Sequence, residues 1–187
     1  MIDKRLTFED HARYIKGKMS RGIGIIIKAS KLLTQESLIT LYYSFIYPFI
    51  NYCISVWGNT NQTYLKCVEM AQKRSVRIIC KVKNRAESSP LFKDLKFLTL
   101  KQLYVYSVQM FMYKYHHSLL PIIFDDFFIY NCNIHDHYTR QMHYLHVPKR
   151  TSNHRAKQIK VMGVQINNLF EGHVNHICSL PVYKKND

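Results

Sequence analysis

Glycine, proline and acidic residues are scarce in this sequence, and each scarcity excludes a class of protein. The 187 residues include only 6 glycines and 5 prolines, too few for a collagen-like repeat or a low-complexity disordered chain. The length suits one domain or two small packed lobes, and 47% hydrophobic residues suffice for a buried core. Acidic residues number 12 against 27 lysines and arginines, a net charge of +15. This imbalance favours an acidic partner, most commonly nucleic acid.

Several catalytic motifs are also absent. The sequence contains no G-x-x-x-x-G-K-[ST], no G-x-S-x-G and no H-E-x-x-H, which removes the commonest nucleotide-binding, hydrolase and metalloprotease interpretations. No catalytic residue and no cofactor is predicted. A nucleophilic triad stays open, because nothing distinguishes one serine or cysteine from the others.

Cysteine usage and the first residues predict a compartment. Five cysteines are an odd number, none of them in C-x-x-C spacing, and the segment from Met1 to Asp10 is charged rather than signal-like. Both features favour a reduced, intracellular protein of the nucleus or cytoplasm.

A long segment lacks charge altogether. No charged residue occurs from Ser37 to Leu65, and Leu38 to Trp57 approaches the length that spans a bilayer. The segment nevertheless carries Pro48 and many tyrosine, serine, threonine and asparagine side chains that would face lipid. We therefore predict a deeply buried helix and no membrane partner.

Apolar residues recur at helical spacing along most of the chain and predict a mainly α fold of two packed lobes. Helices are expected over residues 7–31, 37–57 with a bend at Pro48, 62–82, 100–117 and 164–176, with a further helix start at Ser89 and a short apolar turn or helix over 122–128. The polar linker Arg85 to Ser89 divides the predicted lobes, 1–87 and 88–187. Alternation in Tyr144–Val147 and Lys157–Val161, around a turn at 151–153, predicts a small β-hairpin near the C-terminus.

The segment 62–82 carries the most informative pattern. At about 100° per residue its basic side chains share one arc of a helix and its apolar side chains the opposite arc. Only Glu69 is acidic between Lys66 and Arg85, so salt bridges four residues apart cannot neutralise the arc. A solvated helix face is the simpler alternative, but the pattern favours contact with the phosphates of RNA, DNA or an RNA–DNA hybrid. The predicted backbone-binding residues are Lys66, Lys73, Arg74, Arg77, Lys81, Lys83 and Arg85.

Two further motifs suggest chemistry but have simpler explanations. Phe124-Asp125-Asp126 is similar to a polymerase metal-binding signature, yet it follows Pro121 without the hairpin and third carboxylate that such a site needs. Cys132, His135 and His137, with His143 and His146 downstream, make a zinc site imaginable. Their spacing is not a standard zinc pattern, so no metal site is predicted.

Short motifs follow one another in a characteristic order along nearly the whole chain. They are Leu6-Thr7-Phe8-x-x-His11, Leu41-Tyr42-x-Ser44-x-Ile46-x-Pro48-x-Ile50-x-Tyr52, Val56-Trp57-Gly58, Gln72-Lys73-Arg74-Ser75-Val76-Arg77-Ile78-Ile79, Pro90-Leu91-Phe92, Leu98-Thr99-Leu100, Ile134-His135-x-x-Tyr138-Thr139-Arg140 and Gly163-x-x-x-Asn167-x-Leu169. This order resembles the C-terminal, thumb and post-thumb part of a non-LTR retrotransposon reverse transcriptase of the jockey-like or LINE-like kind. The sequence departs from the family at Ile166, where a tryptophan is expected, and at Phe170, where a proline is expected.

The resemblance implies a role and leaves alternatives open. The intact enzyme of that family is an RNA-directed DNA polymerase whose thumb grips the template–primer duplex, so residues 1–87 would be thumb-like and 88–187 post-thumb. The family's endonuclease, fingers and palm, with the palm Asp-Asp site, are not in this chain, which is expected not to polymerise alone and has the palm of a parent protein as a further candidate partner. The alternatives are a helical protein-interaction module and an inactive relic of a truncated element.

Overall fold

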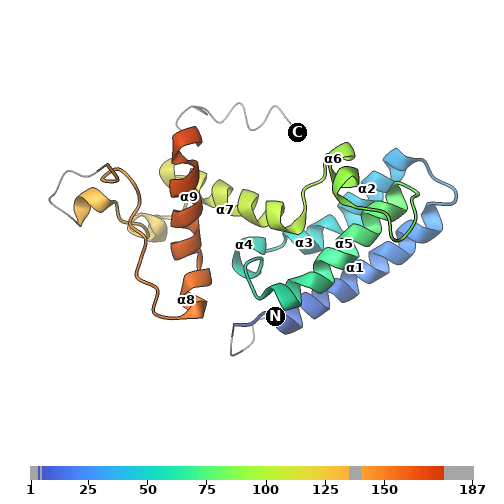
Figure 1. Cartoon of the computed structure of the whole chain (residues 1–187), viewed down its shortest axis with the longest axis horizontal. Coiled ribbons are helices and arrows are strands. Elements are labelled where there is room, and N and C mark those ends of the chain that lie inside the picture. Colours follow the sequence, from blue (N-terminus) through green and yellow to red (C-terminus); the bar gives the residue numbers. More distant parts are fainter. Residues whose placement is uncertain (1–3, 5, 135–139, 175–187) are drawn as a thin grey trace. The chain divides into compact units, whose positions relative to one another are not determined.

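The computed structural model describes residues 4, 6–134 and 140–174. These residues are mainly helical and include no strand, which confirms the mainly α prediction. The helices are α1 (Glu9–Ala29), α2 (Gln35–Phe45), α3 (Tyr47–Asn51), α4 (Ile54–Trp57), α5 (Gln62–Ile79), α6 (Ser89–Asp94), α7 (Leu100–His116), the 3-10 helices η1 (Ile122–Phe124) and η2 (Asn131–Asn133), α8 (Asn153–Lys157) and α9 (Ile159–Val174) (Figure 1).

The chain divides into two compact units, Met1–Tyr106 and Ser107–Asp187. The division therefore falls within α7 rather than in the polar linker at 85–89. Hydrogen bonds from α5 to the residues after this linker explain the difference, because Gln72 binds Leu98 and Leu100. The thumb-like and post-thumb lobes inferred from the resemblance stay a prediction.

The first unit is built around α1, α2 and α5. Helices α1 and α5 lie side by side along much of their length, and α2 packs against both (Figure 1). Each presents an apolar stripe to the others, because its hydrophobic residues recur every three or four positions. The fully buried side chains at the centre include Met19, Ile26, Leu38, Val68 and Val76.

Gly22 allows α1 and α2 to approach closely. A Cβ atom at this position would lie 2.7 Å from the carbonyl oxygen of Phe45 and 3.2 Å from its Cβ. Glycine usually weakens the interior of a helix, but α1 continues through Gly22 without a break. The missing side chain is a packing requirement here, since any larger residue would push the two helices apart.

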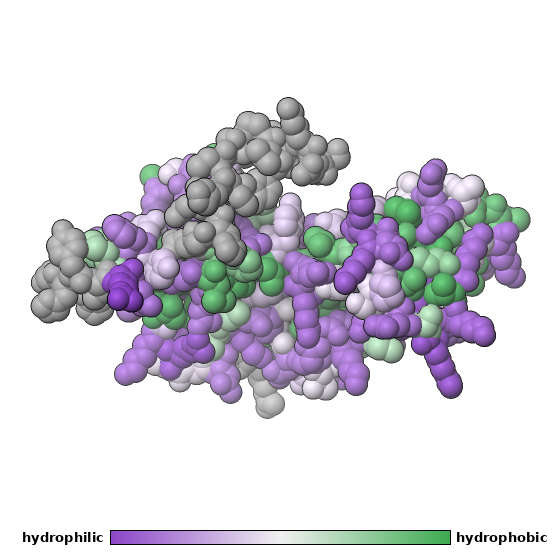
Figure 2. Space-filling model, turned by 45° about the horizontal axis from the view of Figure 1, so that its top comes forward, coloured by the Kyte–Doolittle hydropathy of each residue, from purple (hydrophilic) through white to green (hydrophobic). Residues whose placement is uncertain are grey.

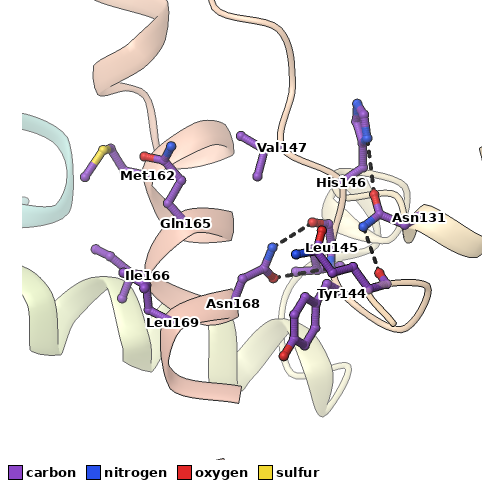
Figure 3. A pocket seen from close by; sticks show the side chains of 11 residues that line it. Asn131, Tyr144, Leu145, His146, Val147, Met162, Gln165, Ile166, Asn168 and Leu169 are labelled. Atoms are coloured by element: carbon purple, nitrogen blue, oxygen red, sulfur yellow. Dashed lines mark hydrogen bonds between the residues drawn. The ribbon is translucent and has the colours of Figure 1, made fainter. Parts of the chain in front are cut away.

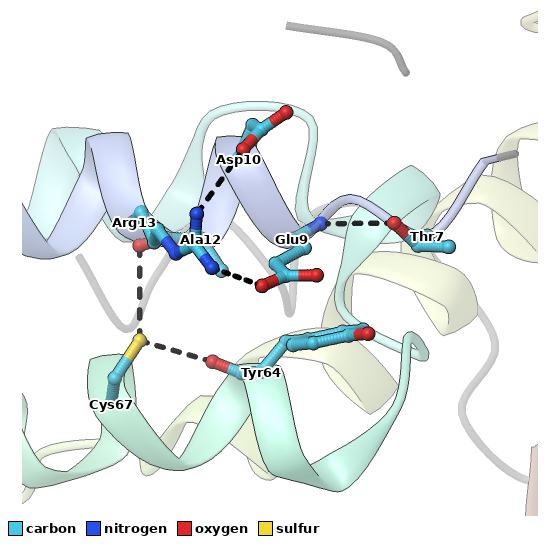
Figure 4. A network of polar contacts seen from close by, with 7 residues as sticks. All are labelled: Thr7, Glu9, Asp10, Ala12, Arg13, Tyr64 and Cys67. Carbon is cyan, nitrogen blue, oxygen red and sulfur yellow. Dashed lines mark hydrogen bonds and ion pairs between the residues drawn. The ribbon is translucent and has the colours of Figure 1, made fainter. Parts of the chain in front are cut away.

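Polar contacts fix the beginning of α1 against α5 (Figure 4). The Thr7 hydroxyl accepts from the Glu9 amide at 3.5 Å, and Arg13 forms ion pairs with Glu9 and Asp10. Across the helix pair, the Cys67 thiol contacts the Ala12 carbonyl at 3.9 Å and the Tyr64 carbonyl at 3.1 Å. Cys67 is half-buried, and its thiol is a weak donor between the two helices.

The predicted single helix over 37–57 is wrong in detail. It is three helices, α2, α3 and α4, because Pro48 has no amide hydrogen and so occupies the first turn of a new helix. Cys53 then adopts a left-handed conformation with φ 50°, which separates α3 from α4. Trp57 is 1% exposed and donates its indole hydrogen to the Tyr52 carbonyl at 2.8 Å, holding this turn in place.

Tyr104, in α7, packs against Gly58 and has a buried hydroxyl that forms no hydrogen bond within the described part of the chain. Burial raises the pKa of this phenol to about 12. Since the folded-state pKa lies above the usual value of about 10, the neutral form is stabilised in the folded state and stability falls as pH rises above about 10.

Most core substitutions destabilise the folded state, but replacing Tyr104 with Phe should leave its stability unchanged or increase it. At about pH 7 the variant should unfold with equal free energy or up to about 1 kcal/mol more, because an unpartnered buried hydroxyl is removed. At about pH 11 the difference in unfolding free energy between the variant and the wild type should be larger, because only the wild type loses stability through ionisation of the Tyr104 phenol. Urea unfolding at both pH values measures this, and a destabilised variant at neutral pH would show that the hydroxyl has a partner.

The second unit contains the remainder of α7 followed by α8 and α9. Gly163 of α9 lies close to Met112 and Phe128, where an added Cβ would be 3.0 Å from the Met112 sulfur. Ser152 begins α8 by accepting from the Arg155 amide at 3.2 Å, as an N-cap residue does. Val161 and Val164 are fully buried on the inner side of α9.

The predicted β-hairpin is wrong. Residues 157–161 end α8 and begin α9, and Tyr144–Val147 lies in irregular backbone with one isolated antiparallel bridge, between Tyr130 and Leu145. The Asn168 side chain occupies the place of a partner strand, accepting from the Leu145 amide at 3.3 Å and donating to its carbonyl at 2.9 Å. A helix-borne amide thus satisfies the backbone that the alternation suggested would pair with a strand.

Hydrophobic and hydrophilic side chains are unevenly distributed over the first unit. Hydrophobic groups gather where α1 leads into α2, while long hydrophilic side chains stand out elsewhere on the visible face (Figure 2). Exposed apolar residues at this end are Ile25, Leu32, Leu33 and Phe45. Among the described residues, no helix is long and apolar enough to cross a membrane.

Candidate nucleic-acid interface

Helix α5 has the two faces that its sequence predicts. Leu65, Val68, Val76 and Ile79 are buried against the first unit. Lys66 and Arg74 are exposed, and Lys73 and Arg77 are half-buried. We call these four side chains, Lys66, Lys73, Arg74 and Arg77, the basic face of α5.

Among the residues that the structure describes, no carboxylate forms an ion pair with the basic face. Glu69 accepts a hydrogen bond from the Gln62 side chain at 3.1 Å instead of pairing with a lysine. Within the described part of the chain, the ion pairs involve Arg13 and none includes a residue of the basic face. Four cations on one helix, without acidic partners, are suited to contact with phosphates.

The remaining predicted cations lie beyond the helix, which ends at Ile79 rather than Val82. Lys81 has φ 53°, the Lys81 amide donates to Ile78 at 3.1 Å, and the Val82 amide donates to Arg77 at 3.1 Å. These two bonds form the Schellman motif that closes many helices, usually with glycine in the left-handed position. Lys81, Lys83 and Arg85 are thus exposed in the following loop and do not continue the arc of α5.

Arg77 has a structural contact besides its charge. Its Nε donates to the Ala86 carbonyl at 2.8 Å, so the guanidinium holds the loop of residues 80–87 against α5. The same contact keeps Lys83 and Arg85 on the segment that returns toward the helix. A substitution at Arg77 would therefore change both the charge and the loop, so it is a poor probe of binding alone.

Gln72 positions α5 and was not recognised from the sequence as structurally important. Its side chain is 1% exposed, and its amide nitrogen donates to the Tyr42 hydroxyl at 3.0 Å and the Leu98 carbonyl at 2.9 Å. Its oxygen accepts from the Leu100 amide at 3.0 Å. One buried amide thus joins α5 to α2 and to the start of α7, which fixes the orientation of the basic face.

The burial of Tyr42 follows from the same arrangement. Its ring stacks on Phe97 with centroids 4.4 Å apart, and burial raises the pKa of its phenol. Tyr42 is therefore a core residue. It does not present a ring on which a base could stack.

The motifs with possible catalytic or metal chemistry show no such site in the described residues. Phe124 ends η1, and Asp125 and Asp126 are exposed beyond it. No group of three or more histidine, cysteine or acidic residues is placed to hold a metal within the described ranges. His135 and His137 lie outside those ranges, so the zinc site stays a sequence-based alternative.

The second unit contains a hollow of about 650 Å³ between the 141–147 segment and α9 (Figure 3). Its rim is held by amides, since Asn131 donates to the Gln141 carbonyl at 2.9 Å and shares a hydrogen bond of 3.3 Å with His146. Met162, Ile166 and Leu169 add apolar wall. In the described part of the chain, no lysine, arginine or carboxylate lines this hollow.

A comparison with curated proteins gives one partial similarity. The chain is 26% identical over 104 residues to a protein described as a probable RNA-directed DNA polymerase from transposon X-element of Drosophila melanogaster. This supports a reverse-transcriptase-related region. The match covers 54% of this chain and 11% of the relative's length. No family model matches the sequence, and no solved structure is similar to it.

Proposed function

We propose that this chain is a non-catalytic, thumb and post-thumb part of a non-LTR retrotransposon reverse transcriptase that holds the template–primer backbone with the basic face of α5. The observation that carries the proposal is this unneutralised cationic face on a helix whose opposite side is fully buried. The partial similarity to a transposon RNA-directed DNA polymerase supports it independently.

This function requires binding to the nucleic-acid backbone that does not depend on base sequence. A polymerase must let the duplex advance, so contacts to base edges would hinder it, whereas contacts to phosphates are the same at every step. Lys66 and Arg74 project freely from a rigid helix, and that helix is anchored by the Gln72 hydrogen bonds. Displacement of counterions from the duplex would supply the binding free energy.

Binding of the purified chain to an RNA–DNA hybrid duplex tests the proposal. Four to seven phosphate contacts predict that log K falls against log salt with a slope between about −3 and −6. Fluorescence anisotropy titrations between about 50 and 200 mM salt measure it. Similar affinity for hybrids of unrelated sequence is also expected. A cooperatively folded chain that binds no hybrid even at low salt would contradict the proposal.

A protein-interaction module is the second candidate, and the exposed apolar residues where α1 leads into α2 favour it. In that case the basic residues would serve solubility, and a complex with the protein partner would depend weakly on salt. The palm of a parent polymerase is the partner that both candidates share. An inactive relic would instead lack a cooperative unfolding transition in a thermal melt.

A further inference from the structure

A second cationic feature lies beside the basic face, between α5, α6 and the start of α7. It is a hollow of about 460 Å³ lined by Lys73, Ser88, Ser89, Phe92, Lys93, Lys96, Phe97, Leu98, Thr99 and Gln102. Among the residues that the structure describes, three lysines and no carboxylate contribute to its lining. Lys73 belongs to both the hollow and the basic face, so the two features adjoin.

Ser88 is a mostly buried residue whose hydroxyl is available to a ligand in the hollow. It is 8% exposed and lines the hollow, and its carbonyl accepts from the Phe92 amide at 3.1 Å. Its hydroxyl forms no hydrogen bond with any other residue that the structure describes. The Ser88 oxygen is not among the fully buried, unpartnered atoms of the described residues, so it reaches solvent within the hollow. A ligand oxygen in the hollow could therefore accept a hydrogen bond from this hydroxyl.

Lys96 stands at a position where glycine is usual. It has φ 54°, and the Phe97 and Lys96 amides close α6 by donating to Phe92 at 2.8 Å and Lys93 at 3.1 Å. In this motif the left-handed residue is commonly glycine, because a side chain there is strained. A lysine at this position adds a positive charge to the lining that glycine would not.

The aromatic residues of the hollow favour a phosphate over a base as its ligand. Phe92 and Phe97 are only 4% and 5% exposed, and Phe97 already stacks on Tyr42. Neither ring is free to stack on a base. The available groups are ammonium and hydroxyl donors, together with the Gln102 amide nitrogen, since the Gln102 oxygen already accepts from Thr99. Donors of this kind match phosphate oxygens.

We propose that this hollow binds one phosphate of the nucleic-acid strand that the basic face of α5 holds. Lys73, Lys93 and Lys96 neutralise its charge, and the Ser88 hydroxyl donates to one of its oxygens. This rests on the proposed function, because it assigns the hollow to the same strand. A seated phosphate would fix the register of the backbone on α5, which an open helix face alone does not do.

The test compares two double variants of the full chain with equal charge change. The first, Lys93→Gln with Lys96→Gly, removes two charges from the hollow, and glycine accepts φ 54° without strain. The control, Arg21→Gln with Lys28→Gln, removes two exposed charges from α1 on the side turned away from α5. The hollow variant should bind an RNA–DNA hybrid about tenfold more weakly and lower the salt slope by about 2, and the control much less. Equal effects of the two variants would overturn the proposal.

Inorganic phosphate provides an independent test. Titrated at constant ionic strength into the ¹⁵N-labelled chain, it should shift amide signals of residues 88–99 saturably, and Ser88→Ala should weaken this binding several-fold without a change of charge. Diffuse shifts along the chain, or no effect of Ser88→Ala, would overturn the proposal. If the wild type binds no hybrid, the proposed function is wrong. Saturable phosphate shifts would in that case still support a phosphate site in the hollow, but not its assignment to a nucleic-acid strand. If charge reversal on α5 weakens hybrid binding and the hollow variant does not, only the hollow is refuted.

Discussion

Reversing two charges on the basic face, with Lys66→Glu and Arg74→Glu, should weaken binding to an RNA–DNA hybrid by about 10- to 100-fold at about 100 mM salt. Both side chains are exposed and lie on one side of α5, so each would lose a phosphate contact and add repulsion. The salt slope should fall by about 2, and single- and double-stranded nucleic acids should be affected alike. Anisotropy titrations over a salt series measure both quantities.

The matched control places the same four-unit charge change elsewhere in the same unit. Arg21→Glu with Lys28→Glu alters two exposed cations of α1 on its outer side. Because net charge acts at a distance, this control should also weaken binding to the hybrid. The loss of affinity and the change in salt slope should both be smaller than for the α5 pair. Arg77 is left unchanged, since its bond to Ala86 would confuse loop stability with binding. Equal losses in both variants would mean that α5 is not the contact surface.

Replacing Gln72 with Leu should destabilise the fold by about 3 kcal/mol or more. The substitution keeps the volume but leaves the Leu100 amide, the Leu98 carbonyl and the Tyr42 hydroxyl without their buried partner. Each buried group left unpaired costs about 1 to 3 kcal/mol. Urea unfolding monitored by circular dichroism measures the loss, and a cycle with Tyr42→Phe should show positive coupling.

Gln62→Leu provides the control for this prediction. It is the same substitution on the same helix, but Gln62 is exposed, and within the described residues its side chain bonds only to Glu69. A change within about 0.5 kcal/mol is expected. Should Gln72→Leu unfold like the wild type, the buried amide would not be what joins α5 to α2 and α7.

The amphipathic pattern of residues 62–79 predicted the buried and exposed sides of α5 correctly, because helical periodicity depends only on residue spacing. The start of α6 at Ser89-Pro90 and the extent of α7 were predicted for similar local reasons. The exact end of α5 was not predicted. A left-handed lysine at position 81 closes the helix, and lysine carries no sequence signal for that conformation.

Contacts between distant residues could not be predicted. Gln72 reads as one polar position within a basic stretch, and its three partners lie about 26 to 30 positions away. The incorrect prediction of a β-hairpin has the same cause, a contact with a distant residue. Alternation over 144–147 is a local signal for a strand, but the Asn168 amide from α9 satisfies that backbone instead. The hollow near Lys73 likewise arises from three segments that the sequence shows only separately.

A lysine footprint of the chain, with and without an RNA–DNA hybrid, tests directly whether the basic face of α5 binds nucleic acid. Acetylation by a water-soluble ester, quantified by mass spectrometry, reports how accessible each lysine is. We expect the hybrid to protect Lys66 and Lys73 on α5 severalfold and to leave Lys28 on α1 as reactive as before. Equal protection of all three, or protection confined to Lys28, would contradict nucleic-acid binding by the basic face.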